Sequence, residues 1–295
     1  MKEIVLITGA NGLVAKHLAQ RLTVQYDVRL LTRYPNKVNE YKWDVTTKTI
    51  DPKALENVSH VIHLAGANIF EKRWTAKRKQ EIISSRVDSA HLILDALKQK
   101  QQKIKTFVSA SAIGFYGAVT TDTIFTENDA KGDDFLSDVV DLWENAANNF
   151  DIQNMASRVV KIRTAVVFAD KNSALQKMEQ PIKNYIGATL GSGKQYMPWI
   201  HIDDLCSIYE CALQDSNMVG VYNAVAPQHI TNKELTQLIA KKLKKPLWLP
   251  PVPSLILRLA FGESVCMLLE GSRVSCEKLQ KEGFHFQYND IETFA

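Results

Sequence analysis

The first 170 residues alternate between short apolar runs and segments whose apolar positions have helical spacing. The run at 5–7 leads into an amphipathic pattern over 13–22, and a longer helical pattern covers 74–99. Further apolar runs, which predict strands, lie at 28–31, 61–64, 107–108 and 159–168. Strands that alternate with helices in this way predict an α/β fold, a doubly wound parallel sheet of Rossmann type with helices on both faces.

The pattern changes after about residue 170, where the alternation weakens and prolines become frequent. We therefore predict a Rossmann domain over 1–170, with core strands that recur to about 225, and a smaller C-terminal substrate lobe over 171–295. Residues 254–270 form an apolar helical pattern that is too short and too interrupted to cross a membrane. We expect this segment to pack in a core.

A glycine-containing turn follows the first predicted strand. In TGANGLVAKHL, at 8–18, Gly9 allows a tight turn and Gly12 allows the backbone to approach a pyrophosphate, which a helix N-terminus attracts. The third small residue is Ala15, which helix-to-strand packing tolerates. Because the motif follows a strand and opens a helix, it indicates a dinucleotide site rather than a plain turn.

The end of the second predicted strand indicates which dinucleotide binds. A site that prefers NAD places an acid there to hold the ribose hydroxyls, whereas this chain has Thr32 and Arg33. A guanidinium attracts a 2′-phosphate and a carboxylate repels it. The sequence therefore predicts NADP as the cofactor.

Composition and charge argue against several other classes of function. The formal net charge is +4, and the lysines at 241–245 are typical of a solvated helix end, so we expect no nucleic-acid partner. The four cysteines have neither CxxC nor zinc-type spacing, which predicts free thiols and no metal site. Without a signal peptide pattern or a membrane-spanning run, we expect a cytoplasmic protein with no membrane partner.

Together the motifs resemble those of the extended short-chain dehydrogenases/reductases, in particular an atypical epimerase-like branch that ends in a small domain of unknown function. The resemblance covers nearly the whole chain. It rests on TGANGLVA, LTRYPNK, HLAGANI, RWTAKRKQEIISSRV, SASAIGFYG, LWENAA, GSGKQYMPWIHIDDL, YNAVAP and LLEGSRV. It implies a Rossmann domain that binds NADP and a C-terminal lobe that closes over a substrate cleft.

The resemblance also implies which residues contact the cofactor. They are Gly9, Asn11, Gly12, Leu13, Val14, Thr32, Arg33, Leu64, Ala65, Gly66, Glu81, Arg86, Ser109 and Val167. Glu81 and Arg86 lie on the long predicted helix, and a surface ion pair explains their spacing equally well.

Members of the superfamily use a tyrosine, a lysine four residues later, and a serine that polarises the substrate oxygen. Ser111 in SASAIGFYG matches the serine. Aligning LWENAA with the lysine-bearing turn places Glu144 at the lysine and Val140 at the tyrosine, so the usual dyad is absent. A carboxylate opposes a phenolate instead of stabilising it, and valine transfers no proton.

Three residues are candidates to replace the dyad. Tyr116 either faces the cleft or packs in the core with its hydroxyl satisfied. Glu144 could act as a base if it is buried beside the cofactor, although a glutamate on a helix is usually solvated. His201 could titrate near neutral pH, but the resemblance implies a mainly architectural role for its segment. Ser111 and Tyr116 are our catalytic candidates.

On the substrate side, related nucleotide-sugar enzymes carry an arginine where this chain has Met197, and a thioether forms no charge-assisted bond to a diphosphate. Lys194 is a candidate replacement. The sequence thus predicts an NADP-dependent oxidoreductase or epimerase-type enzyme for a small carbonyl or hydroxyl compound, acting as a monomer or homodimer. The alternative is an NADP(H)-binding sensor or scaffold without turnover. A polar cavity within reach of Ser111 favours the enzyme.

Overall fold

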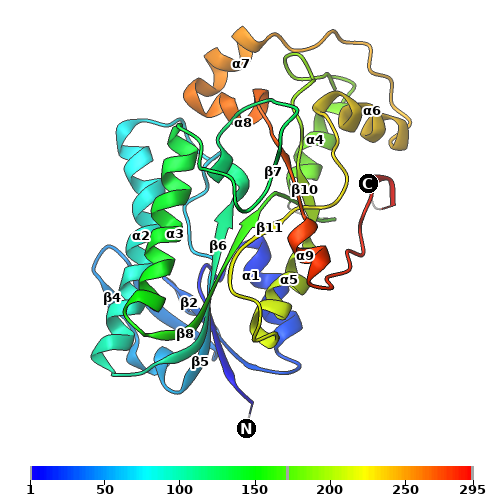
Figure 1. Ribbon diagram of the computed structural model, residues 1–295. Helices are drawn as coiled ribbons and strands as arrows, with labels where there is room; N and C mark the ends of the chain where they lie inside the picture. The colour runs from blue at the N-terminus through cyan, green and yellow to red at the C-terminus, as the bar shows by residue number, and fades with distance from the viewer. Residues whose placement is uncertain (1, 171–172, 294–295) are drawn as a thin grey trace.

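The computed structural model describes residues 2–170 and 173–293, and its centre is an eight-stranded sheet (Figure 1). In spatial order the strands are β11 (Gly220–Ala224), β8 (Ala156–Thr164), β6 (Ile104–Ala112), β5 (Val58–His63), β1 (Ile4–Ile7), β2 (Asp27–Thr32), β3 (Glu40–Asp44) and β4 (Thr49–Ile50). Neighbouring strands are parallel except for the pair β3 and β4. The predicted fold class is confirmed.

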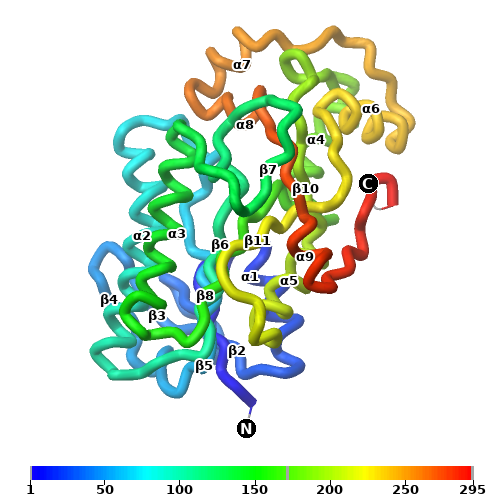
Figure 2. Tube along the Cα trace, in the orientation of Figure 1, coloured from blue at the N-terminus to red at the C-terminus, as the bar shows by residue number. Residues whose placement is uncertain are grey.

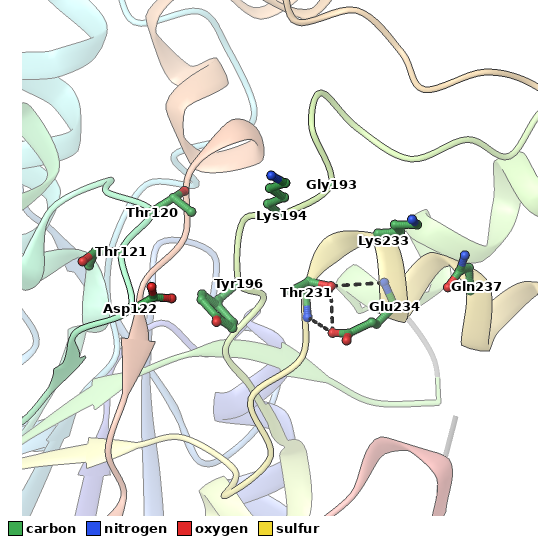
Figure 3. Close-up of a pocket in the computed structure, with 10 residues that line it drawn as sticks. All are labelled: Thr120, Thr121, Asp122, Gly193, Lys194, Tyr196, Thr231, Lys233, Glu234 and Gln237. Atoms are coloured by element: carbon green, nitrogen blue, oxygen red, sulfur yellow. Dashed lines mark hydrogen bonds between the residues drawn. The ribbon is translucent and has the colours of Figure 1, made fainter.

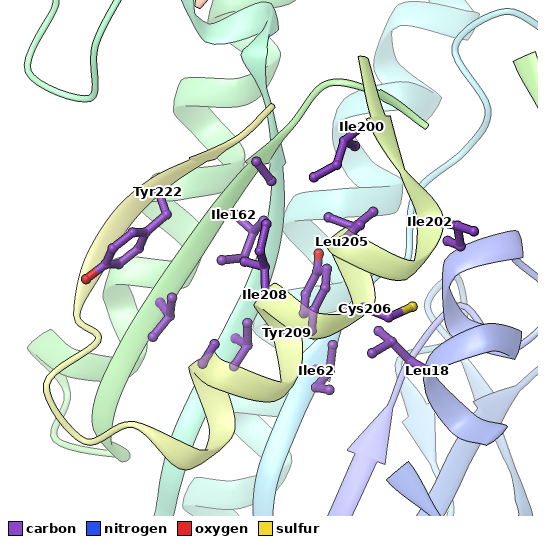
Figure 4. Close-up of a cluster of buried hydrophobic side chains, with 14 of the residues drawn as sticks. Leu18, Ile62, Ile162, Ile200, Ile202, Leu205, Cys206, Ile208, Tyr209 and Tyr222 are labelled. Atoms are coloured by element: carbon purple, nitrogen blue, oxygen red, sulfur yellow. The ribbon is translucent and has the colours of Figure 1, made fainter. Parts of the chain in front are cut away.

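Helices cover both faces of this sheet, as its apolar strands require. On one face α2 (Ala76–Gln99) and α3 (Phe135–Ile152) pack on β5, β6 and β8, with Phe150 of α3 stacked on Phe107 of β6. On the other face lie α1 (Leu13–Leu22) and α5 (Ile202–Gln214). Figure 4 shows how Leu205, Ile208 and Tyr209 of α5 point toward strand residues of this second core.

The strand order places a crevice beside β1. The chain leaves β1 for β2 and β3 on one side, then returns to place β5 on the other side of β1. At such a switch point the connections that follow the two strands diverge, and a ligand site opens at their carboxyl ends. Gly9 and Gly12 lie in the connection after β1, so the topology brings them to this crevice.

A smaller set of elements forms the C-terminal lobe (Figure 2). Its helices are α4 (Ala174–Lys183), α6 (Asn232–Lys242), α7 (Ser254–Phe261), α8 (Cys266–Leu269) and α9 (Glu277–Lys281). Two two-stranded sheets join distant parts of the chain: β9 (Val166–Phe168) with β10 (Trp199–His201), and β7 (Ile124–Phe125) with β12 (Arg273–Val274). The 3-10 turns are η1 (Pro52–Leu55), η2 (Ile113–Tyr116), η3 (Gly262–Val265) and η4 (Ile291–Thr293).

The predicted domain boundary adjoins residues 171–172, which lie outside the described residues. After that boundary the chain enters the lobe with α4 and then returns to the first domain. Helix α5 packs against α1, and β11 extends the large sheet beside β8. The two parts are therefore interlocked rather than consecutive.

Two predicted elements differ from the structure. The apolar run at 159–168 is two strands, because the N–H of Ala165 bonds to the carbonyl of Ala224 while β9 leaves the sheet to pair with β10. The apolar segment 254–270 breaks at Gly262, whose φ is +65°, into α7, η3 and α8.

The expectation that this apolar segment packs in a core is wrong for α7. Only Leu257 of that helix is buried, while Leu255 and Leu259 are 67% and 69% exposed. Among the described residues, no helix combines the length and the apolarity needed to cross a bilayer.

Candidate functional site

A cavity of about 510 Å³ lies at the crevice beside β1. It is lined by Gly9, Ala10, Asn11, Gly12, Leu31, Thr32, Arg33, Trp43, Asp44, Val45, Thr46, Leu64, Ala65, Gly66, Ala67, Asn68, Glu71, Arg78, Glu81, Ser84 and Ser85. Its walls come from the turns that follow β1, β2, β3 and β5, and from the first turns of α2. Nine of the residues predicted as cofactor contacts line it.

The turn after β1 suits a phosphate. Gly9 has φ +71°, and a Cβ there would lie 2.9 Å from the carbonyl oxygen of Leu64, so only glycine fits. Gly12 is the N-cap of α1 and supplies no side-chain bond to the helix N-terminus, whose first turn also lacks an acid. The first N–H groups of α1 therefore stay available to an anionic ligand.

The wall formed by β2 carries the predicted 2′-phosphate residues. Thr32 is buried, whereas the side chain of Arg33 is exposed and makes no ion pair within the described residues. This guanidinium is therefore free to meet a phosphate. The fit is consistent with NADP.

The sequence analysis missed the wall formed by β3, where residues 43–46 line the cavity. Asp44 ends β3, and its carboxylate accepts the N–H of Thr46 at 2.8 Å. This strand was missed because EYKWD contains no apolar run and only Trp43 among its residues is buried. The only available signal was an acid after a short stretch of β-forming residues.

Glu81 is paired, but not with the residue that its spacing suggested. Its carboxylate accepts a bond from the guanidinium of Arg78 at 2.7 Å, and Glu71 lies 3.2 Å from the same group. Arg78 is 4% exposed and also donates to the carbonyl of Asn68. The alternative of a surface ion pair between Glu81 and Arg86 is therefore wrong, because Glu81 pairs with Arg78 instead. Arg78 lines the cavity and was not among the predicted residues.

Arg86 lies behind the cavity wall. Its guanidinium packs against the Cα of Gly66, donates to the carbonyls of Ile82 and Ala67, and stands 5.0 Å from the ring centre of Trp143. Burial lowers the pKa of Arg86 to about 10. Arg86 thus supports the turn after β5 and does not itself line the cavity.

Four other predicted cofactor residues also do not line this cavity. Leu13 and Val14 are half-buried in the first turn of α1, where they pack on the α1–α5 core. Ser109 is buried in β6, and its hydroxyl donates to the carbonyl of Ala110. Val167 is half-buried in β9.

Ser111 and Glu144 belong to one buried polar cluster between β6, β8 and α3. The hydroxyl of Ser111 donates to Glu144 Oε1 at 2.6 Å. Arg163, near the end of β8, binds both carboxylate oxygens of Glu144, with Nε at 2.7 Å and Nη2 at 2.9 Å. Burial by itself would lower the pKa of Arg163, but hydrogen bonds and charge from Glu144 raise it.

Glu144 is therefore not the solvated glutamate that its helical position suggested, since it is 5% exposed. The sequence reasoning missed its partner, Arg163, because a single arginine in the strand ASRVVKIRT gives no sign of its direction. The bidentate contact fixes the position of the carboxylate, which in turn fixes the direction of the serine hydroxyl.

Tyr116 lies deeper in the same cluster. Its hydroxyl donates to Asn223 Oδ1 at 2.8 Å and accepts a bond from Arg163 Nη1 at 3.0 Å. Tyr116 is 2% exposed, and burial raises its pKa to about 12. This environment favours the interpretation of a packed aromatic with a satisfied hydroxyl.

The cluster lies next to the cavity along the edge of the sheet. Residues 64–68 of the cavity follow β5, and β6, the next strand, ends at Ala112 just after Ser111. Three strand spacings separate β2 from β6, about 14 Å. A dinucleotide bound with its adenosine at β2 and β3 would have to cross β1 and β5 to reach Ser111.

A second cavity of about 620 Å³ lies in the C-terminal lobe and shares no residue with the first (Figure 3). Lys194 and Tyr196 line it, together with Thr231 and Lys233 at the start of α6. Met197 does not line it and instead packs, half-buried, on the core of the lobe. Lys194 and Met197 therefore face different surroundings.

His201 serves the fold. It is the N-cap of α5, where its Nδ1 accepts the N–H of Asp203 at 3.2 Å, and its ring lies 3.7 Å from that of Tyr288. Burial lowers its pKa. All four cysteines are free.

Comparison with known proteins adds a family context. A model described as the NAD dependent epimerase/dehydratase family matches residues 5–136, and one described as a domain of unknown function, DUF1731, matches residues 252–294. The chain is 34% identical over 294 residues to the epimerase family protein YfhF of Bacillus subtilis, covering 98% of this chain and 95% of that protein.

Solved structures agree with this similarity. The crystal structure of human epimerase family protein SDR39U1 with NADPH has a TM-score of 0.86 and 28% identity, covering 98% of this chain and 96% of that one. The nucleoside-diphosphate sugar epimerase from Corynebacterium glutamicum has a TM-score of 0.80 and 30% identity, covering 99% of this chain and 57% of that one.

Proposed function

Since this chain belongs to the NAD-dependent epimerase/dehydratase family, we propose that it is an NADP(H)-dependent oxidoreductase or epimerase-type enzyme for a small carbonyl or hydroxyl compound. One observation carries the proposal. The cavity beside β1 combines an uncapped helix N-terminus with an unpaired Arg33, and Ser111 lies near the end of β6, the second strand from β1 in the sheet. The solved human relative with NADPH supports the choice of cofactor.

The residues that hold the cofactor follow from the cavity walls. Gly9 and Gly12 let the pyrophosphate approach the first N–H groups of α1. Arg33 and Thr32 receive the 2′-phosphate, and residues 43–46 border the adenine. When bound, the nicotinamide supplies or accepts a hydride.

Ser111 positions the substrate oxygen. Because its proton is directed to Glu144, its remaining lone pairs accept a hydrogen bond from a substrate hydroxyl or from a water. Glu144 acts as a positioning residue, since both of its carboxylate oxygens are bound by the guanidinium of Arg163 and one of them also accepts the bond from Ser111. Tyr116, with its high pKa and enclosed hydroxyl, supports Arg163. A bound water passes the proton between the substrate oxygen and solvent, toward the substrate when a carbonyl is reduced and toward solvent when a hydroxyl is oxidised.

The test combines cofactor binding with turnover. Purified protein is titrated with NADPH and NADH, and NADPH oxidation is then followed with a panel of small aldehydes and ketones. We expect Arg33→Asp to weaken NADPH binding at least tenfold while NADH binding changes little, because the 2′-phosphate then meets a carboxylate. Ser111→Ala should lower turnover about a hundredfold at unchanged NADPH affinity.

Exposed Ser216 offers a matched control, since Ser216→Ala removes the same hydroxyl far from the cavity. Equal losses of NADPH and NADH binding in Arg33→Asp would remove the NADP assignment. Tight NADPH binding without turnover of any compound in the panel would favour the sensor or scaffold.

A further inference from the structure

Helix α7 and the segment before it expose an apolar surface that no other described element covers. Trp248, Leu255, Ile256, Leu259 and Phe261 are 66%, 67%, 55%, 69% and 41% exposed. We call these five residues the α7 patch. Five large apolar side chains within fourteen residues exceed the scattered single exposures of an ordinary surface, and such a patch marks a contact with something else.

The α7 patch lies at the outer limit of the molecule. In Figure 1 the chain from α6 to α7 runs along the upper margin, at the end opposite the N-terminus, and no other element lies above it. Figure 2 shows the same course in the tube view. The patch is therefore accessible to a flat, extended partner.

The chain segment that contains the α7 patch, residues 235–262, carries charge of one sign. Between Glu234 and Glu263 the chain contains no acidic residue, while it contains five cations, Lys241, Lys242, Lys244, Lys245 and Arg258. Lys241, Lys242, Lys244 and Arg258 are exposed. A partner that covers this segment must therefore combine negative charge with an apolar interior.

Trp248 can make such a contact without losing a hydrogen bond. Its indole N–H already donates to the carbonyl of Tyr185 at 3.0 Å, and Lys245 Nζ lies over the ring of Tyr185 at 3.9 Å. Since the polar edge of Trp248 is satisfied, its exposed face can enter an apolar phase without stranding a donor.

We propose that the α7 patch docks this protein on the surface of an anionic lipid bilayer, which departs from the sequence expectation of no membrane partner. Leu255, Ile256 and Leu259 enter the boundary between headgroups and acyl chains, and the lysines at 241–244 bind lipid phosphates. A second copy is a poorer occupant, because a symmetric contact brings two sets of cations together.

The proposal is tested by flotation of the full-length protein with vesicles of phosphatidylcholine alone and vesicles that also contain about 30% phosphatidylglycerol. We expect binding to the anionic vesicles at low salt and at least tenfold weaker binding to the neutral ones. Leu255→Ser/Ile256→Ser/Leu259→Ser should reduce binding to anionic vesicles at least tenfold. Lys241→Gln/Lys242→Gln should reduce it about twenty-five-fold, since each surface cation contributes about fivefold.

Matched controls remove similar groups elsewhere. Val24, Val38 and Ile152 are 74%, 100% and 75% exposed, so Val24→Ser/Val38→Ser/Ile152→Ser deletes exposed apolar surface outside the α7 patch. Lys98→Gln/Lys100→Gln removes two exposed cations at the end of α2. Both controls should bind vesicles like the unaltered protein, and thermal melts check that every variant folds.

Two results would overturn the proposal. The first is that the protein does not bind anionic vesicles at low salt, or that Leu255→Ser/Ile256→Ser/Leu259→Ser binds them as well as the unaltered protein does. The second is a dimer in light scattering that this same triple variant dissociates, which would assign the α7 patch to a second copy of the chain.

Discussion

At the residue scale, the pair of Glu144 and Arg163 is expected to dominate the local energetics. Both side chains are buried, so removal of one leaves an uncompensated charge. We expect Glu144→Gln to lower the free energy of unfolding by about 3 kcal/mol, and Arg163→Met by a similar amount. The double variant should cost less than the sum, as urea denaturation in a double-mutant cycle would show.

An exposed pair provides the comparison for this cycle. Glu277 and Lys281 lie 2.8 Å apart with side chains 68% and 75% exposed. Glu277→Gln should leave the free energy of unfolding essentially unchanged, because water screens that pair. Strictly additive losses for Glu144 and Arg163 would show that the buried pair is not a unit.

His63 makes a separate contribution that depends on pH. Its Nδ1 accepts the indole N–H of Trp143 at 3.4 Å, so its Nε2 donates to Ser89 at 2.7 Å. Protonation would place a second donor against that indole. Burial, with a smaller repulsion from Arg86, lowers the pKa of His63 to about 3.

This lowered pKa sets the direction of the pH dependence. The neutral imidazole favours the folded state, so the contribution is complete above the unfolded pKa of 6.5 and is lost as pH falls toward 3. Between pH 7 and pH 5 the loss should be about 2 kcal/mol. His63→Gln should remove this part of the slope in urea titrations, whereas His285→Asn, at an exposed position, should not.

At the element scale, the two glycines in the turn between β1 and α1 have different roles, Gly9 in stability and Gly12 in cofactor binding. Gly9 is required by its φ of +71° and by the carbonyl of Leu64, whereas Gly12 has an ordinary φ of −71° and meets only the carbonyl of Gly9 at 3.1 Å. We expect Gly9→Ala to cost about 2 kcal/mol of stability. Gly12→Ala should cost less stability but weaken NADPH binding at least tenfold.

Gly220 isolates the effect of backbone strain in this comparison. Its φ is +85°, and an added Cβ there would meet nothing within 4 Å. Gly220→Ala should therefore cost about 1 kcal/mol and leave cofactor binding unchanged. Calorimetry of all three variants gives both quantities, and normal NADPH affinity in Gly12→Ala would contradict the role assigned to that glycine.

The elements differ in how well sequence predicts them. Helix α1 and strands β2 and β5 were predictable because each buries one continuous apolar stripe or run. β3 was not, because it contains no apolar run and only Trp43 among its residues is buried. At the site, Gly9 and Gly12 follow from local geometry, while the bonds of Glu144 and Arg163 depend on the register between β8 and α3, which no local pattern contains.

For α7 the sequence predicts the helix but not its exposure. The composition SLILRLAF is that of a core helix, and periodicity alone cannot distinguish a core from an apolar surface. The difference depends on whether other elements cover the helix. Here the break at Gly262 directs the chain back to the lobe and leaves α7 outside.

At the scale of the whole molecule, Arg73 connects the two parts of the protein. It donates to the carbonyls of Leu259 and Ala260 at the end of α7, while Lys79 of α2 pairs with Glu263. We expect Arg73→Ala to speed hydrogen exchange in α7 and in residues 67–75, but not in β1 or β6. Arg29, which bonds three carbonyls near η1, provides the matched control as Arg29→Ala.

The position of Arg73 has a thermodynamic consequence. It lies between Glu71 and Arg78, which line the cavity proposed for the cofactor, and the end of α7, so one joint adjoins both the proposed cofactor site and the proposed membrane-binding patch. If each ligand shifts this joint, reciprocity requires that vesicles change NADPH affinity by the same factor by which NADPH changes vesicle affinity. The fraction of the protein on membranes would then depend on the concentration of NADPH. Arg73→Ala would remove this dependence of vesicle binding on NADPH.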